Sequence, residues 1–377
     1  MRNAIIGIII GMVVGVVIGA TFLAPRLNNN TTTISGERIE HLSPPSTAAV
    51  SVETSAPEIS WRMASAYAGS LPQIGTLATR VGQEIWRISG GEMEISFHEP
   101  ETLVPTAELF DAVESGTIDV AFASPGLWKD DVPAVQLFSS VPFGPPPSEF
   151  MAWFYFGGGR ELYEKIYHRK GVHGIVCGII APEASGWFRN EILTVEDLRG
   201  LKIRFLGLGA RVLEKLGVKA VKLGDDEIFS AFESGTIDAA EFSMPTVDFQ
   251  LGIHKMAKHY YFPGWHQPST LFELMINLEK WEALPSTAKA RVETVCGDNI
   301  RHGLAEAEAA QFAALKNIYS TGVNIHRWPA EIIKELEQAW QQVVAEQSKN
   351  DADFKRVWNS LKAFREDYSI WHELGRP

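Results

Sequence analysis

The sequence predicts an α/β protein with two lobes and a cleft between them. Three observations lead to this prediction: a length of 377 residues, short apolar strands that alternate with amphipathic helices, and a six-residue motif, Glu-Ser-Gly-Thr-Ile-Asp, that occurs twice. A chain of this length can bury a sizeable core and form two domains of ordinary size. Because each motif belongs to an α/β unit, two copies imply two related lobes.

The repeated motif occupies residues 114–119 and 233–238, so its copies are 233 − 114 = 119 positions apart. In each copy an apolar-periodic helix ends at Glu-Ser-Gly, and Gly116 or Gly235 is expected to adopt the left-handed conformation that ends many helices. Strands are expected near both copies, at 93–97, 118–123, 201–205 and 237–242. Their alternation with helices indicates parallel sheets.

The carboxyl ends of these strands are the expected ligand site. In open α/β sheets, ligands bind in the crevice beyond the strand ends. Here those ends are residues 123–125 in the first unit and 241–245 in the second.

Composition is that of a globular protein, with 45% hydrophobic and 21% charged residues. The formal net charge of −12 argues against nucleic acid or an anionic membrane surface as the main partner. With two cysteines the chain has no disulfide framework. Cys177 lies in an apolar run and Cys296 in a helical one, so both are expected to be buried small hydrophobes and not a disulfide pair.

The N-terminus predicts a membrane anchor. Residues 4–24 carry no charge and are long enough to span a bilayer as a helix, with Arg2 on the cytoplasmic side. An uncleaved anchor over 1–26 is favoured over a cleaved signal segment, because Pro25 follows Ala24 and disfavours cleavage there. Residues 27–57 are rich in Asn, Thr, Ser and Pro and are expected to form a flexible tether.

The glycines of the anchor recur every fourth residue, at Gly7, Gly11, Gly15 and Gly19. They share one helical face, which allows a second helix to approach closely. The alternative is that they only dilute a very hydrophobic segment.

The folded part is expected over residues 58–377, outside the inner membrane. Lobe 1 is predicted at about 58–180 and lobe 2 at about 181–280. Residues 281–377 are mainly helical, with helices expected at 286–319, 330–345 and 353–371. These helices either brace the two lobes or pair with another subunit.

Several segments resemble one transport family. They are Gly186-Trp-Phe-Arg189, Val195-Glu-Asp-Leu-Arg-Gly-Leu-Lys-Ile-Arg204 and Tyr260-Tyr-Phe-Pro-Gly-Trp265. They resemble TRAP transporter solute-binding proteins of the DctP-like family, in the branch that binds 2-oxo acids and related monocarboxylates with a metal ion. The resemblance covers about residues 58–371 and implies a periplasmic-binding-protein-like fold with an interlobe cleft and long C-terminal helices.

The resemblance also implies a binding site. In that family the arginine at the position of Arg204 forms a bidentate pair with the ligand carboxylate, which suits the two parallel donors of a guanidinium. The alternative is an arginine that points outward to a surface ion pair. The metal ion, sodium or calcium, is held by side chains at the positions of Glu183, Glu241 and Gln267 and by the main-chain carbonyl of Phe242, consistent with the oxygen preference of hard cations.

Two positions depart from the family pattern. Relatives carry Gln where this chain has Glu183, and Glu where it has Gln267. If both positions face one ion, the exchange moves a carboxylate across the site and keeps its total charge. The alternative is two independent surface substitutions. Phe242 also stands where relatives have Trp, which is harmless if only its carbonyl is used.

Aromatic residues are candidates for the pocket walls. Trp187 and Trp265 are expected either to shape the pocket and exclude water or to be ordinary core. Tyr67 and Trp128 are the candidates from lobe 1.

The implied function is capture of a small organic acid outside the cytoplasm and its delivery to a TRAP membrane permease, without catalysis. An input domain of a sensor and a periplasmic enzyme are the alternatives. Gly207-Leu-Gly209 lacks the third glycine of a dinucleotide loop, because Val212 stands there. His254, His259 and His266 are too scattered for a catalytic triad and are expected at the surface or in caps. The exact ligand, sodium against calcium, cleavage of the leader and a possible homodimer stay open.

Overall fold

The computed structural model describes residues 57–224 and 227–376. Within them, no helix combines the length and the apolarity that crossing a membrane requires. The predicted anchor or signal segment (1–26) and all but the last residue of the predicted tether (27–57) lie outside the described residues.

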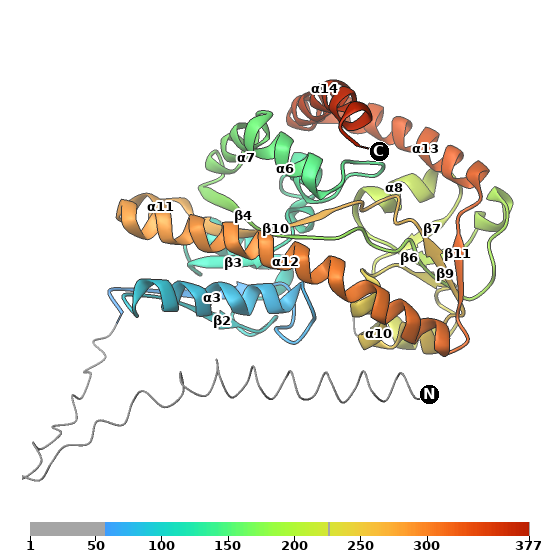
Figure 1. Cartoon of the computed structure of the whole chain (residues 1–377), viewed down its shortest axis with the longest axis horizontal. Coiled ribbons are helices and arrows are strands. Elements are labelled where there is room, and N and C mark those ends of the chain that lie inside the picture. Colours follow the sequence, from blue (N-terminus) through green and yellow to red (C-terminus); the bar gives the residue numbers. More distant parts are fainter. Residues whose placement is uncertain (1–56, 225–226, 377) are drawn as a thin grey trace, which may run out of the picture. The chain divides into compact units, whose positions relative to one another are not determined.

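Two sheets organise the described part of the chain (Figure 1). The first has the strand order β2 (Met93–His98), β1 (Ile59–Ser65), β3 (Val120–Ala123), β10 (Thr270–Asn277), β4 (Val172–Ile180). The second has the order β11 (Asn324–Arg327), β9 (His259–Phe262), β5 (Gly186–Phe188), β8 (Ala239–Ala240), β6 (Lys202–Arg204), β7 (Lys219–Val221). The predicted α/β fold class is confirmed.

Each sheet contains one β-α-β-α-β unit built around the repeated motif. The first unit runs through β1, α3 (Gly75–Ser89), β2, α4 (Leu109–Glu114) and β3, and the second through β6, α8 (Gly207–Lys215), β7, α9 (Ile228–Glu233) and β8. Within each unit the three strands are parallel and the first strand lies in the middle. The predicted parallel pairing is therefore confirmed inside the units.

The two copies of the motif make the same turn. Gly116 (φ 75°) and Gly235 (φ 72°) both adopt the left-handed conformation, as predicted. Asp119 Oδ2 then accepts a hydrogen bond from Arg62 N (2.7 Å), and Asp238 Oδ2 accepts one from Lys202 N (3.0 Å). In both units the motif aspartate thus ties its strand to the central strand of the same sheet.

Antiparallel strands extend both sheets and carry the chain between them. In the first sheet β10 pairs antiparallel with β3 and β4, and in the second β5 pairs antiparallel with β8 and β9. This differs from the predicted lobe 2 range of 181–280, because β10 crosses back into the first sheet. The second sheet also contains a strand, β11, from the part of the chain that was predicted to be mainly helical. Lobes therefore do not follow continuous stretches of sequence.

Helices from the C-terminal part of the chain pack on the first sheet and on helices from the units of both sheets. The long α12 (Ser286–Ser320) packs on β4 and α3, and farther along on α10 (Pro245–Leu251) (Figure 1). The next helix, α13 (Ala330–Asn350), packs on α8, whereas α14 (Ala352–Leu374) packs on α6 (Pro147–Phe156) and α7 (Gly159–His168). Of the two predicted roles, bracing is thus observed. The remaining α-helices of the described residues are α5 (Gln136–Ser139) and α11 (Leu278–Ala283).

The two cysteines form a disulfide, so the prediction of two free thiols was wrong. Cys177 on β4 is bonded to Cys296 on α12, and both are buried as expected. Next to the bond, Asn299 Nδ2 donates a hydrogen bond to Cys177 O (2.7 Å). The sequence pattern could not reveal the pair, because a buried cysteine on a strand or helix has the same neighbours whether or not a second one packs on it.

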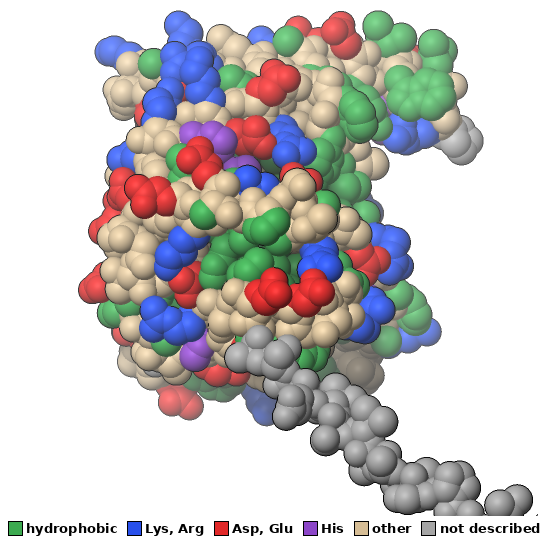
Figure 2. All heavy atoms as spheres, turned by 90° about the vertical axis from the view of Figure 1, so that its left-hand side faces the viewer, with side chains coloured by type: hydrophobic (Ala, Val, Ile, Leu, Met, Phe, Trp, Pro, Cys, Tyr) green, Lys and Arg blue, Asp and Glu red, His purple; other side chains and the backbone are tan. Residues whose placement is uncertain are grey.

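One face of the molecule, at the end of the first sheet, has acidic and basic side chains interspersed around an apolar area (Figure 2). The acidic excess of the chain does not gather into a single patch on this face.

Candidate ligand and cation site

Arg204 and Glu241 meet at the carboxyl ends of two neighbouring parallel strands. Arg204 is the last residue of β6 and pairs with Ala240 of β8, so Glu241 follows directly beside it. Glu241 N donates to Arg204 O (2.9 Å), and Arg204 Nη1 donates to Glu241 O (2.6 Å) and lies 3.6 Å from Glu241 Oε2. The Arg204 side chain is 5% exposed, so the alternative of an outward surface ion pair is wrong.

Glu183 reaches this place from one of two segments that connect the sheets. The segment 181–185 leads from β4 to β5, and the segment 263–269 leads back from β9 to β10. Glu183 N donates to Gln267 O (3.2 Å), which joins the two segments to each other. The Glu183 Oε1 atom accepts hydrogen bonds from the hydroxyls of Ser243 (3.3 Å) and Thr270 (3.4 Å).

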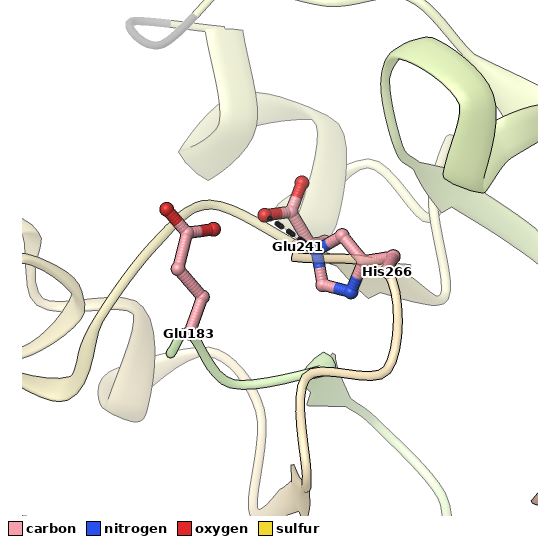
Figure 3. Close-up of side chains that lie close together, drawn as sticks. All are labelled: Glu183, Glu241 and His266. Carbon is pink, nitrogen blue, oxygen red and sulfur yellow. Dashed lines mark ion pairs between the residues drawn. The ribbon is translucent and has the colours of Figure 1, made fainter. Parts of the chain in front are cut away.

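His266 completes a cluster with the two glutamates (Figure 3). One potential ligand atom from each of Glu183, Glu241 and His266 lies within 4.8 Å of the others. His266 Nε2 is 3.3 Å from Glu241 Oε1, and all three residues are buried. The prediction that His266 is a surface or capping residue was wrong, and the same holds for the buried His254.

The cluster fits a cation. Glu183 Oε2 and Glu241 Oε1 are buried without a hydrogen bond from any described residue. Burial, then the nearby carboxylates of Glu241 and Asp248, raise the pKa of Glu183 well above its usual range. Two buried carboxylates at this separation need a proton or a positive ion between them. The orphaned oxygens are the donors that a hard cation takes.

The two other predicted metal positions lie at the edge of this cluster. Gln267 Nε2 donates to Thr270 Oγ1 (2.8 Å), the hydroxyl that also reaches Glu183. Gln267 and Glu183 therefore face one shared hydroxyl. The ring of Phe242 lies against the guanidinium of Arg204, with 5.1 Å from Cζ to the ring centroid.

The two predicted wall residues, Trp187 and Trp265, pack in different surroundings. Trp265 stacks between Phe143 and Phe205, with centroid distances of 5.6 and 6.1 Å, and directly precedes His266. Trp187 is fully buried and stacks on Tyr260 at 3.8 Å, so it packs in the core of the second sheet.

A further buried carboxylate near the cluster is that of Asp248, which no sequence pattern indicated. Its carboxylate accepts hydrogen bonds from Trp187 Nε1 (2.7 Å), Tyr260 Oη (2.8 Å) and Ser243 N (3.0 Å). Burial raises the pKa of Asp248 to about 7, although the bonds from Trp187 and Tyr260 lower it. Because Ser243 also donates to Glu183, Asp248 supports the loop that orients that carboxylate.

The two predicted residues from the first lobe lie outside the strands and contact β10 of the first sheet. Trp128 is buried, and its Nε1 donates to Glu273 Oε1 (2.8 Å) on β10. Tyr67 packs edge-on against Phe272 at 5.5 Å. A role for either in ligand contact stays a prediction. For His266, the available signal was its position between Trp265 and Gln267, both of which were expected to face the site.

The comparisons with known proteins place the chain in a family. Residues 64–351 match the family described as "Bacterial extracellular solute-binding protein, family 7", DctP, and the chain belongs to it. Its members are periplasmic, substrate-binding transport proteins, and they work with TRAP permease subunits. The predicted resemblance is thereby confirmed.

Among curated proteins, the chain is 32% identical to the monocarboxylate 2-oxoacid-binding periplasmic protein of Nostoc sp. over 326 residues, 86% of this chain and 89% of the relative. Among solved structures, a TRAP solute-binding protein from Bordetella bronchiseptica, a mixed-occupancy dimer with copurified calcium and picolinate, has TM-score 0.81 and 33% identity, over 84% of this chain and 95% of that one. A protein from Colwellia psychrerythraea with calcium and pyruvate has TM-score 0.80 and 29% identity, over 84% and 97%. One from Pseudoalteromonas atlantica with sodium and pyruvate has TM-score 0.79 and 29% identity, over 83% and 95%.

Proposed function

We propose that this protein captures a small monocarboxylate of the 2-oxo acid class together with a metal ion and delivers it to a TRAP permease. The observation that supports this most directly is the buried guanidinium of Arg204 beside the Glu183–Glu241–His266 cluster. Relatives that share the fold at about 30% identity hold pyruvate with calcium or sodium.

Arg204 would bind the ligand carboxylate. A guanidinium presents two parallel donors to two carboxylate oxygens, and burial strengthens such charge-assisted hydrogen bonds. Arg204 Nη1 donates a hydrogen bond to Glu241 O, and the Phe242 ring lies against the guanidinium. The Arg204 side chain is therefore fixed before the ligand arrives. Preorganisation of this kind reduces the entropy lost on binding.

Glu183 and Glu241 would hold the cation, with Gln267 and the Phe242 carbonyl as the further predicted donors. A bound cation would offset the two carboxylates and attract the ligand's negative charge. Glu183 and Gln267 share the Thr270 hydroxyl, which supports the hypothesis that a carboxylate has moved across one site.

Clamp closure would bury the ligand. Glu183 and Gln267 lie on the two segments that connect the sheets, so a ligand and cation held there would join the moving parts. Reopening on the permease would release them, and no bond needs to be made or broken.

Calorimetric titration of the chelator-treated full-length protein with pyruvate, alone and with calcium or sodium, tests the proposal. Wild type is expected to bind only when a metal ion is present. Arg204→Lys should weaken binding by about 100-fold, because an ammonium cannot match both oxygens. Arg189→Lys is the control, since Arg189 directly follows β5 of the second sheet and its guanidinium also lies over a phenylalanine ring, that of Phe232, outside the cluster. Equal affinity of Arg204→Lys and wild type would exclude Arg204 as the carboxylate partner.

Glu183→Gln tests the exchange of carboxylates separately. The variant should weaken metal and pyruvate binding together, whereas Glu183→Gln combined with Gln267→Glu should restore both. Unchanged binding in the single variant would show that the two departures from the family pattern are independent.

Location and assembly form the last part of the proposal. Residues 1–26 would tether the protein to the periplasmic side of the inner membrane, and the Cys177–Cys296 disulfide suits that oxidising compartment. A homodimer through the C-terminal helices is supported by exposed apolar side chains at the end of α14, Ile370 and Trp371. Light scattering of the purified protein and capture of a permease, as opposed to a kinase, test these points.

A further inference from the structure

We propose that His266 is a direct ligand of the cation, so that the site accepts a divalent transition-metal ion such as Mn²⁺ or Zn²⁺ more tightly than Ca²⁺. The inference rests on the proposed function in placing a cation among these side chains. It adds a nitrogen donor to a site otherwise made of oxygen.

The first observation is the lack of hydrogen bonds to the imidazole. His266 is 2% exposed, and neither Nδ1 nor Nε2 has a hydrogen-bond partner among residues 57–224 and 227–376. Its Nε2 is 3.3 Å from Glu241 Oε1, which makes an ion pair when the ring is protonated (dashed in Figure 3), but the two atoms do not form a hydrogen bond. Buried polar atoms nearly always have a hydrogen bond, so imidazole nitrogens without one, beside carboxylate oxygens without one, indicate a shared third partner.

The second observation is how firmly the ring is held. The Phe205 ring packs edge-to-face against the imidazole, with 4.6 Å between the ring centroids. The Trp265 ring also packs edge-to-face against it, at 5.5 Å. Helix α8 approaches closely at Gly209, where a Cβ would come within 2.5 Å of Phe205 Cε1 and 3.0 Å of His266 Cβ. The Gly-Leu-Gly segment, which is no dinucleotide loop, thus leaves room for the imidazole.

The donor set decides the class of ion. Two carboxylates alone suit Na⁺, Ca²⁺ or Mg²⁺, whereas neutral imidazole is a ligand of Mn²⁺, Zn²⁺ and their neighbours. One potential ligand atom from each of Glu183, Glu241 and His266 lies within 4.8 Å of the others, so one small divalent ion can contact all three. A nitrogen ligand adds little to the binding of Na⁺, so the imidazole shifts the metal preference of the site toward transition-metal ions.

Pulsed electron paramagnetic resonance of Mn²⁺ bound to chelator-treated, full-length protein tests the inference. The spectrum should show coupling to an imidazole ¹⁴N, and incorporation of ¹⁵N-histidine should change that coupling. His266→Gln should abolish the coupling and weaken Mn²⁺ binding by about tenfold or more. The matched control is His254→Gln, since His254 is also buried but stacks on Phe249 away from the cluster.

The outcomes separate this inference from the proposed function. Bound Mn²⁺ without nitrogen coupling in wild type, or coupling that persists in His266→Gln, overturns the inference, and calcium-dependent pyruvate binding would still stand. Nitrogen coupling with no pyruvate binding under any metal supports the inference and overturns the function. If His266→Gln does not fold, the ¹⁵N-histidine comparison on wild type alone decides.

Discussion

The two β-α-β-α-β units have the same strand order and the same turn, but only the second carries a charged site. With the repeat offset of 119, Glu241 corresponds to residue 241 − 119 = 122, which is Phe122. Arg204 pairs with Ala240 as Ala64 pairs with Ala121, so the counterpart of Arg204 is Ala64. Both counterparts are apolar and buried.

The difference teaches that the repeat specifies the scaffold and two substitutions specify the chemistry. In the first unit the strand ends merge into a hydrophobic core. In the second unit the same positions hold a guanidinium and a carboxylate that water cannot reach. Such groups persist in a core only when paired, and there Arg204 lies beside Glu241, with Glu183 and His266 close to that carboxylate.

The first sheet has a brace of its own, and removing it should give the largest effect. The double variant Cys177→Ala, Cys296→Ala opens a link across a sequence separation of 119 residues. The free energy of unfolding should fall by about 4 kcal/mol, because the unfolded chain gains the entropy of a long open loop. Urea unfolding measures the loss. Metal affinity should stay within about twofold, since the disulfide lies between β4 and α12; a large loss of affinity would mean that the two sheets are coupled through it.

Arg204→Ala makes the second unit resemble the first at one position. When the Arg204 guanidinium is removed, the Glu241 carboxylate stays buried next to Glu183 but has lost its positively charged neighbour. We expect a loss of about 3 kcal/mol in unfolding free energy in the absence of metal. Phe122→Leu in the first unit should cost about 1 kcal/mol and leave ligand affinity unchanged. If Arg204→Ala is as stable as wild type, the pair is not a structural necessity of the second unit.

Glu273 gives the first sheet a pH dependence. This fully buried carboxyl accepts hydrogen bonds from Trp128, Tyr163 and Tyr167, and burial raises its pKa to about 7. Because the folded pKa lies above the unfolded value, the stabilising contribution is complete below the unfolded pKa and is lost as the pH rises through about 7. Relative to Glu273→Gln, wild type should therefore lose about 2 kcal/mol between pH 5 and pH 7.5.

Parallel denaturation series at the two pH values measure that difference, with the exposed Glu114→Gln as the control. Equal pH profiles of wild type and Glu273→Gln would mean that the Glu273 carboxyl titrates at its ordinary pKa in the folded protein.

The motif aspartates should give the smallest effects. Asp119→Asn and Asp238→Asn each weaken the tie from the motif to the central strand, and each should lower the unfolding free energy by about 1 kcal/mol. Asp119→Asn should cost more, because Asp119 also forms an ion pair with Lys280, 35% exposed. Thermal unfolding of the two single variants measures both losses; a larger loss for Asp238→Asn would contradict the extra contribution expected from the Lys280–Asp119 ion pair.

Local sequence determined the scaffold and half of the site. The repeated Glu-Ser-Gly-Thr-Ile-Asp fixes a helix end, a left-handed glycine and a strand, because these depend on backbone preferences of adjacent residues. Parallel strand ends lie at one edge of a sheet, so Arg204 and Glu241 are neighbours wherever that topology forms.

Tertiary structure alone decided the rest. The Cys177–Cys296 bond, the return of β10 to the first sheet and the approach of His266 to Glu241 all join residues that no local pattern links. Each depends on how the chain crosses between two sheets, which is set by the packing of whole elements. Periodicity reports which face of an element is buried, but the partner on that face is chosen by the assembled core.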